Sequence, residues 1–340
     1  MFALTLLMAA LFGLGVALLV GSNAMRIGRG LKVLDLPDGD RKLHARATPL
    51  VGGIAVGAAS VAGAVLSLWQ GADTYLVWLM VAVTVMFGIG IVDDRRHLPP
   101  VTRLIAAVSL LLIVIAVVPE FRVTDLRFSW MVQALPLGLA FGLVFTLLSL
   151  VGLLNAVNMA DGKNGIVAGM ALVWTLVLAA HASPSLLPLL VATGVALAVI
   201  GAYNMAGKLF LGDGGSYAVS ALFGLLAIVI YNEPGSGMAA DDVALLFAIP
   251  VLDTIRLMAA RMARGQSPFM GGRDHLHHFI YARVGWPQGL AVYLALVALP
   301  NAGALLWPGS AVAWLAASLV AYAATIVAMR GATTAGAPAE

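Results

Sequence analysis

Long apolar stretches separated by short polar segments run through almost the whole chain. A helix needs about 20 apolar residues to cross a bilayer core of about 30 Å. Eleven stretches reach or approach this length, at approximately 2–22, 50–70, 74–92, 103–118, 134–155, 165–181, 185–204, 215–231, 243–260, 287–306 and 309–329. This pattern predicts an all-α, polytopic integral membrane protein with about 11 transmembrane helices. We expect residues 1–330 to form a single transmembrane domain and 331–340 a short disordered tail.

Composition supports this class and removes several kinds of chemistry. Apolar residues make up 61% of the chain and charged residues 10%, whereas soluble proteins carry about 25% charged residues. The chain has no Cys, which excludes disulfides, thiolate zinc sites, iron–sulfur clusters and a cysteine nucleophile. The net charge of +3 is too small to argue for a nucleic-acid partner.

The distribution of basic residues predicts the topology. If the stretches cross the membrane in turn, alternate loops lie on opposite sides. Of the 19 Lys and Arg residues, 17 lie in or next to one set of loops, and only Arg122 and Arg127 lie in the other. Because Lys and Arg concentrate in cytoplasmic loops, the first set and the C-terminal tail are predicted to be cytoplasmic, and the N-terminus extracytoplasmic. The alternating segment 121–128 predicts a small extracytoplasmic hairpin.

Nearly all polar clusters fall in the predicted cytoplasmic loops. A single cluster of this kind is usually a solvated or lipid-anchoring helix end. These clusters instead mix carboxylates, amides and histidines, which lipid anchoring does not need. They are Asp93-Asp94-Arg95-Arg96-His97, Asn155-x-x-Asn158-x-x-Asp161-x-x-Asn164, Lys208 with Gly212-Asp213-Gly-Gly-Ser216, and Arg261 with Asp274 and His275-Leu-His277-His278. Together they predict a catalytic or binding site built from cytoplasmic loops.

The acidic residues suggest distinct roles. Asn155 and Asn158 lie about 60° apart on a helix and form one polar stripe, for which helix–helix hydrogen bonding is the plain alternative. Asp161 follows them, and a carboxylate near a bilayer is costly and usually functional. Asp93 and Asp94 point about 100° apart on a helix, so they cannot share one ligand. At a helix–loop junction one could lie near a metal and the other act as a base.

The segment 212–216 opens a predicted helix, where free amides and the helix dipole favour phosphate. Asp213 within it would repel phosphate unless a cation lies between them. Hard oxygen ligands beside a phosphate suit Mg²⁺, with Mn²⁺ as a substitute. The histidine motif lacks the HExxH pattern of zinc enzymes, and together with the nearby arginines it suits diphosphate binding. Asp253 and Arg256 are expected to form an internal ion pair.

No ATP-binding P-loop is present, because Lys163 is followed by Asn and Lys208 by Leu. Transport is disfavoured because no internal repeat is apparent and the polar groups do not lie near the middle of the spans.

Five stretches, in this order, resemble the polyprenyl-phosphate N-acetylhexosamine-1-phosphate transferases, the bacterial undecaprenyl-phosphate GlcNAc-1-phosphate transferase type of glycosyltransferase family 4. These stretches are Asp35-x-Pro37 to His44 followed by Thr48-Pro-Leu-Val-Gly-Gly53, then Gly90-Ile-Val-Asp-Asp94, Asn155 to Gly162, Lys208 to Ser216, and Ser267-Pro-Phe to His278. The resemblance covers nearly the whole chain. It implies a bacterial inner-membrane enzyme that starts the assembly of lipid-linked glycans such as O-antigen or teichoic acid.

The resemblance also implies the reaction and the site. A sugar 1-phosphate, most simply N-acetylglucosamine 1-phosphate, passes from a UDP-sugar to undecaprenyl phosphate with Mg²⁺, and UMP is released. Direct attack by the acceptor and a covalent Asp intermediate are both left open. By matching position, the catalytic candidates are Asp93, Asp94 and Asp161, with Asp93 or Asp94 deprotonating or positioning the acceptor phosphate. Metal ligands are expected at Asp213 and Asn158. Substrate contacts are expected at Asn155, Asn164, Lys208, Arg261, His275, His277 and His278.

Two positions depart from the family pattern, since His97 replaces the third acid of DDxxD and Asn164 replaces the second Asp of DGxDG. Eukaryotic members resemble this chain at the second position, so activity is expected. The alternatives left open are the related phospho-MurNAc-pentapeptide transferase of peptidoglycan synthesis and a non-catalytic membrane homologue or transporter. Membrane lipid is an expected partner, nucleic acid is not, and a homodimer is left open.

Overall fold

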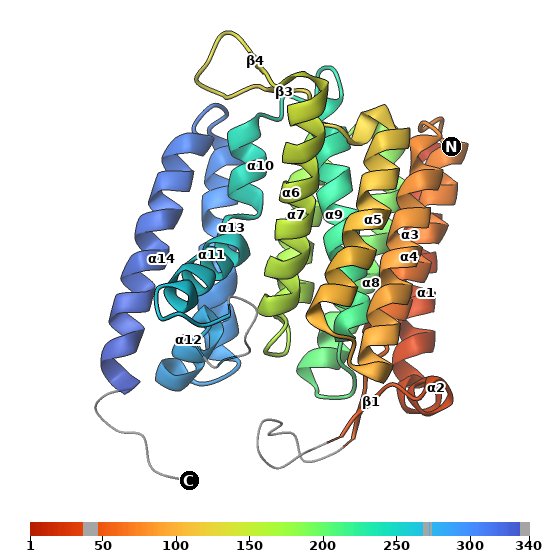
Figure 1. Ribbon diagram of the computed structural model, residues 1–340. Coiled ribbons are helices and arrows are strands. Elements are labelled where there is room, and N and C mark those ends of the chain that lie inside the picture. The colour runs from red at the N-terminus through yellow and green to blue at the C-terminus, as the bar shows by residue number, and fades with distance from the viewer. Residues whose placement is uncertain (37–46, 268–271, 273, 334–340) are drawn as a thin grey trace.

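The computed structural model describes residues 1–36, 47–267, 272 and 274–333. In this part of the chain nearly every element is a helix (Figure 1). In chain order the long helices are α1 (Phe2–Ser22), α3 (Gly52–Trp69), α4 (Tyr75–Arg96), α5 (Pro100–Val117), α6 (Gly138–Ala160), α7 (Ile166–His181), α8 (Leu187–Met205), α9 (Gly212–Asn232), α11 (Ala248–Met262), α13 (Gln288–Leu306) and α14 (Ala311–Thr333). The all-α fold class is confirmed.

Short elements connect the long helices. They are the helices α2 (Ala24–Leu31), α10 (Ala240–Leu246) and α12 (Leu276–Val284), the 3-10 turns η1 (Pro119–Phe121) and η2 (Pro184–Leu186), and the strands β1 (Leu34–Asp35), β2 (Thr48–Pro49), β3 (Asp125–Leu126) and β4 (Leu135–Pro136). Strand β1 pairs with β2, and β3 with β4, both antiparallel. The second pair is the hairpin predicted from the alternating segment 121–128.

Each of the eleven predicted apolar stretches contains a long helix, and nine helices among the described residues are long and apolar enough to cross a membrane. The stretch 243–260 is divided into α10 and α11, which meet at 72° and would count as a tenth span if taken together. The stretch 165–181 becomes the shorter α7, of 16 residues. Apolar side chains such as Leu148, Leu176 and Val327 are exposed on the outer faces, as expected where lipid is the solvent. The protein is a multi-pass membrane protein.

The helix α9 lies at the centre of the bundle. Every residue from Gly214 to Tyr231 is buried, and α3, α4, α6 and α7 pack around this helix. A helix that is apolar on all sides can be buried in the core of a bundle as well as exposed to lipid, and α9 is buried. Its first turn, which carries Asp213, is therefore held at a fixed place among the ends of its neighbours.

The two ends of the bundle differ. The β3–β4 hairpin covers one end, at the top of Figure 1, and we call this the hairpin end. There the hydroxyl of Tyr231 accepts the amide of Arg127, and the carboxylate of Asp241 accepts the amide and hydroxyl of Ser129. The connections α4–α5, α6–α7 and α8–α9 lie at the opposite end together with α12, and we call this the site end. The last helix continues to Thr333, so it includes the first three residues of the predicted tail, and 334–340 lie outside the described residues.

Candidate active site at the site end of the bundle

A close contact between two helices sets the position of Asp94. Gly90 of α4 lies so near α9 that a Cβ on it would stand 2.4 Å from the carbonyl oxygen of Asp213 and the nitrogen of Gly214. One turn later, Asp94 accepts hydrogen bonds from these same two residues, with Oδ1 3.0 Å from the Asp213 amide and Oδ2 3.1 Å from the Gly214 amide. The amides that we expected to be free for phosphate are thus capped by a carboxylate.

Asp93 points in another direction and has its own partners. Its Oδ1 accepts the backbone amide of Leu98 at 2.8 Å, and its Oδ2 lies 2.8 Å from Arg103 and 3.3 Å from the hydroxyl of Tyr217. The side chain is buried. Asp93 also has a side-chain hydrogen bond with Asp213, whereas Asp94 accepts the Asp213 backbone amide, so the two adjacent carboxylates contact different groups of α9. The expected helix–loop junction, however, lies further on, because α4 continues to Arg96.

Asn158 connects α6 to the first turn of α9. Its Nδ2 donates to Oδ1 of Asp213 at 2.7 Å and to the hydroxyl of Ser216 at 3.2 Å. The two predicted metal ligands are thus in direct contact, with the amide nitrogen of Asn158 turned toward the carboxylate. The side-chain carbonyl oxygen of Asn158 is therefore the atom of this residue that could bind a cation.

Asp161 directly follows α6, and in the described part of the chain its carboxylate forms no hydrogen bond or ion pair. Burial, together with the negative charges of Asp213 and Asp94, raises the pKa of Asp161 to about 7. Asp93, Asp94, Asp161 and Asp213 form a carboxylate cluster. Among the described residues, Arg103 is the basic side chain that forms an ion pair with this cluster, through Asp93. When ionised, the four carboxylates therefore carry more negative charge than Arg103 neutralises.

The histidine motif meets the loop that follows Asp161. A Cβ on Gly162 would lie 2.3 Å from Nε2 of His277, and the indole of Trp286 donates to the carbonyl oxygen of Asn164 at 3.0 Å. The ammonium group of Lys163 lies 3.7 Å from the centre of the Tyr281 ring. Two segments that are 122 residues apart in the chain are thus brought into one site.

His277 is buried, and neither of its ring nitrogens has a hydrogen-bond partner among the described residues. Burial, with His278 and His275, holds the pKa of His277 well below its ordinary value, so the ring is neutral. A buried polar group without a partner is costly. The His277 ring is therefore a candidate contact for a ligand that binds beside Gly162.

The remaining predicted contacts have different surroundings. Arg261 is buried on α11 and pairs with Asp274 at 3.1 Å, next to the histidine motif. Lys208 is exposed in the α8–α9 connection, with its ammonium group 5.6 Å from the centre of the Tyr203 ring. The side chain of Asn155 donates to the carbonyl of Val151 in its own helix, and not to a neighbouring helix.

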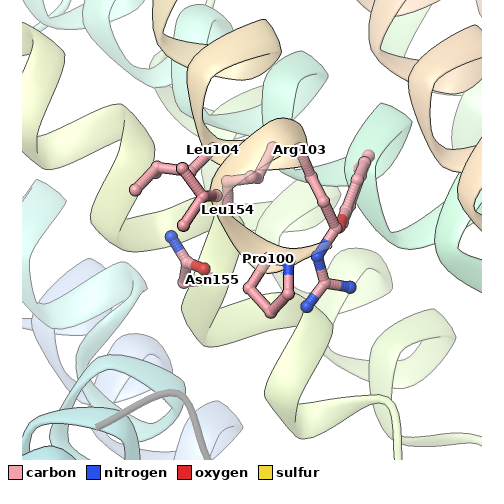
Figure 2. Close-up of a pocket in the computed structure, with 7 residues that line it drawn as sticks. Pro100, Arg103, Leu104, Leu154 and Asn155 are labelled. Atoms are coloured by element: carbon pink, nitrogen blue, oxygen red, sulfur yellow. The ribbon is translucent and has the colours of Figure 1, made fainter. Parts of the chain in front are cut away.

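Asn155 also lines a small cavity between α5, α6 and α9 (Figure 2). The other lining residues are Pro100, Val101, Arg103, Leu104, Leu154 and Tyr217. The cavity has mainly apolar walls and one guanidinium group, that of Arg103, which also pairs with Asp93. It therefore adjoins the carboxylate cluster.

Three site residues were not predicted from the sequence. Arg103 pairs with Asp93 from ten residues away, a spacing that no motif marks. Asn204 accepts the amide of Gly165 and donates to the carbonyl of Leu209, so it joins two site loops. Tyr217 directly follows the 212–216 segment, and this adjacency is the one signal that could have found it.

Some predicted positions lie outside the described residues. These are Pro37 to His44 of the first motif and most of the segment between Ser267 and Asp274. Among the described residues, no group of three or more His, Asp or Glu side chains is placed to hold a metal ion. His97, at the end of α4, is exposed.

The chain is similar to known proteins over most of its length. The family described as Glycosyl transferase family 4 matches residues 76–231. An undecaprenyl-phosphate alpha-N-acetylglucosaminyl 1-phosphate transferase of Yersinia pestis is 30% identical over 85% of this chain and 79% of its own length. A protein of the same name from Escherichia coli K12 is 27% identical over 81% and 76%. A probable undecaprenyl-phosphate N-acetylglucosaminyl 1-phosphate transferase of Bacillus subtilis is 24% identical over 82% and 77%.

Proposed function

The chain belongs to glycosyl transferase family 4, and from this premise we propose that it transfers N-acetylglucosamine 1-phosphate from a UDP-sugar to undecaprenyl phosphate and releases UMP. The observation that carries the proposal is the meeting of Asp93, Asp94, Asp161 and Asp213 with the histidine motif at one end of a membrane bundle. The names of the relatives support the same substrates.

The reaction exchanges one phosphoanhydride for another. An oxygen of undecaprenyl phosphate attacks the phosphorus that carries the sugar, and the bond from this phosphorus to the bridging oxygen of the UDP-sugar breaks. The bridging oxygen and its electron pair leave with UMP, and the lipid retains a diphosphate-linked sugar. Because no bond to ATP is broken, no ATP site is required. Such a transfer needs positioning and charge stabilisation more than covalent catalysis.

The oxygen ligands available in the site fit a hard divalent cation. Asp213 and Asp161 supply carboxylate oxygens, and Asn158 a carbonyl oxygen, in a group with excess negative charge. Mg²⁺ is usually held by one or two carboxylates together with substrate phosphates, and Asp213 and Asp161 would supply the carboxylates. When bound, Mg²⁺ or Mn²⁺ would neutralise charge on the diphosphate.

The two halves of the site suit the two substrates. Arg261 and the neutral His277 lie where they can hold the diphosphate and uridine of the donor. The cavity lined by Arg103 and Asn155 suits a phosphate attached to an apolar chain. Phosphate monoesters have a second pKa of about 6, so the acceptor is largely a dianion at neutral pH. Asp93 and Asp94, whose oxygens are already hydrogen-bonded, then position groups more than they remove protons.

The pH dependence of turnover is predicted to follow Asp161. Its pKa of about 7 means that lowering the pH through 7 protonates a carboxylate that must be ionised to bind a cation or accept a proton. Turnover should therefore fall as the pH decreases from 8 to 6, and more Mg²⁺ should be needed at pH 6. Initial rates measured over a series of Mg²⁺ concentrations at each pH test this. A metal requirement that does not change with pH would contradict it.

We also propose that the site end faces the cytoplasm of a bacterial inner membrane and that the N-terminus is extracytoplasmic. In the sequence, 17 of the 19 Lys and Arg residues lie in or next to one set of loops, and the described loops of that set, such as α4–α5 and α8–α9, lie at the site end. The chain has no Cys, so single introduced thiols report topology. We predict that an impermeant maleimide labels Val132→Cys, but not Gln266→Cys, in intact spheroplasts. Both positions are exposed, so both should label after lysis. Labelling of position 266 before lysis would contradict the proposed topology and indicate the reverse orientation.

The function itself is tested with purified protein, undecaprenyl phosphate, Mg²⁺ and a panel of UDP-sugars. UMP release with UDP-N-acetylglucosamine is the expected result. Release only with UDP-MurNAc-pentapeptide would assign the protein to peptidoglycan synthesis. Well-folded protein that releases no UMP with any donor would indicate a non-catalytic homologue.

A further inference from the structure

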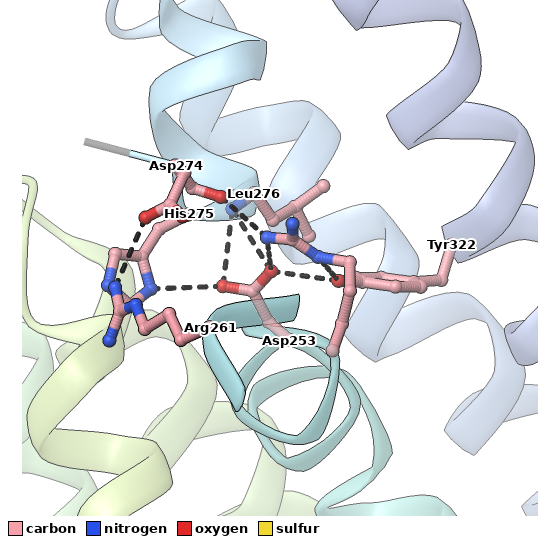
Figure 3. Close-up of polar contacts among 7 residues, drawn as sticks. Asp253, Arg261, Asp274, His275, Leu276 and Tyr322 are labelled. Carbon is pink, nitrogen blue, oxygen red and sulfur yellow. Dashed lines mark hydrogen bonds and ion pairs between the residues drawn. The ribbon is translucent and has the colours of Figure 1, made fainter. Parts of the chain in front are cut away.

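A buried polar network holds the start of α12 against α11 and α14 (Figure 3). At its centre is Asp253 of α11, whose two carboxylate oxygens both lie 3.2 Å from the backbone amide of Leu276. Oδ2 also lies 3.2 Å from Nδ1 of His275. Leu276 is the first residue of α12, so a carboxylate from another helix provides the cap of this helix. Such caps satisfy amides that the helix itself leaves unpaired.

Two further side chains hold Asp253 in place. Arg256 donates to Oδ1 of Asp253 at 2.8 Å and to the carbonyl oxygen of Asp274 at 2.6 Å. Tyr322 of α14 donates its hydroxyl to Oδ1 at 2.8 Å and accepts Nε of Arg256 at 2.7 Å. The expected ion pair of Asp253 and Arg256 is confirmed, but it does more than order one helix. The pair also holds the backbone from Asp274 to Leu276, because Arg256 donates to the carbonyl oxygen of Asp274 and Asp253 accepts the amide of Leu276.

This fixed backbone leads directly into the site. His277 is the next residue along the chain, and it is the side chain that packs on Gly162 beside Asp161. The rings of His275 and His277 are stacked, with centres 5.4 Å apart. A short helix of nine residues has little stability of its own, so its external cap determines where the histidines lie.

We propose that Asp253, with Arg256 and Tyr322, is a positioning residue that holds the His275–His278 motif in register with the Asp161–Gly162 loop for binding of the nucleotide sugar. The inference rests on the proposed function. The hydrogen bonds of Asp253 reach the histidine segment and do not reach the carboxylate cluster. Loss of the Asp253 carboxylate should therefore weaken binding of the UDP-sugar and leave binding of undecaprenyl phosphate unchanged.

The test is Asp253→Asn compared with Asp241→Asn. Asp241 is also a buried carboxylate that accepts a backbone amide and a side chain, but it lies at the hairpin end. We expect Asp253→Asn to raise the KM for the UDP-sugar about tenfold and leave the KM for undecaprenyl phosphate within twofold. Asp241→Asn should lower Tm and change neither KM. A second pair, Tyr322→Phe and Tyr231→Phe, makes the same comparison with hydroxyl groups, and only Tyr322→Phe should raise the donor KM.

Hydrogen–deuterium exchange gives a readout that does not depend on activity. In Asp253→Asn the amides of 276–280 should exchange faster, whereas those of α9 should not change. If the wild-type protein is active and the KM of Asp253→Asn for the UDP-sugar is unchanged, the positioning role is overturned. Wild-type protein that neither binds UDP nor releases UMP would instead contradict the proposed function. If Asp253→Asn does not fold, Tyr322→Phe decides the matter, because it removes one hydroxyl and leaves the carboxylate in place.

Discussion

Asp161→Asn is expected to reduce kcat/KM by a factor of about 10²–10³, the loss found when one preorganised electrostatic group is removed from an active site. The substitution keeps the size and shape of the side chain and removes its charge. The carboxylate of Asp161 has no protein partner to lose in the described part of the chain, and its pKa is raised to about 7 by burial and by neighbouring carboxylates. Steady-state UMP release measures the effect.

The same substitution should not destabilise the fold. A carboxyl group whose pKa is raised on folding opposes folding once the pH exceeds its unfolded value of about 3.9. At pH 8 the Asn variant should therefore have a Tm equal to or above that of the wild type. Asp73→Asn, an exposed acid in the α3–α4 turn, serves as the control and should change neither rate nor Tm. Loss of activity accompanied by a lower Tm would indicate a structural role for Asp161.

Gly90→Ala is expected to reduce both stability and turnover. The added Cβ would stand 2.4 Å from backbone atoms of Asp213 and Gly214, so α4 and α9 must separate. Overpacking of this kind costs about 1–3 kcal/mol. It would also displace Asp94 from the amides that it caps, and a misplacement of about 1 Å at an active site can cost about 100-fold in rate. Tm and UMP release test both parts.

Gly88→Ala is the matched control on the same helix. A Cβ at Gly88 would meet no atom within 4 Å, and Ala favours a helix interior over Gly by about 0.5–1 kcal/mol. We therefore expect this variant to be as stable as the wild type or more so, with unchanged turnover. Equal Tm and equal turnover of the two variants would show that the contact between α4 and α9 does not determine the geometry of the site.

The sequence was sufficient to predict the helices and the grouping of site residues, because both depend on strong local signals. Apolar stretches of bilayer length have few alternatives to a helix, and mixed clusters of Asp, Asn and His are rare at helix ends that merely anchor in lipid. The break between α10 and α11 was not predicted, because it falls at Phe247 within a continuous apolar stretch; the kink-prone Pro250, three residues further on, was the one local signal of a bend.

The partners of the site residues could not be predicted, because they depend on how helices pack. The first turn of α9 was expected to bind phosphate, but the contact at Gly90 brings Asp94 onto its amides. Nothing in the spacing links Arg103 to Asp93, or Tyr322 to Asp253, which is 69 residues away. Local pattern predicted which residues gather at the site end, and tertiary packing determined what each one contacts.

The central claim is that a sugar 1-phosphate, and not a sugar alone, is transferred. It is tested most directly with UDP-N-acetylglucosamine that carries ³²P in the phosphate attached to the sugar, incubated with the purified protein, undecaprenyl phosphate and Mg²⁺. The account predicts that the label moves to the lipid together with the sugar and that the released nucleotide is unlabelled UMP. Label that leaves with the nucleotide as UDP, while the sugar alone reaches the lipid, would contradict it.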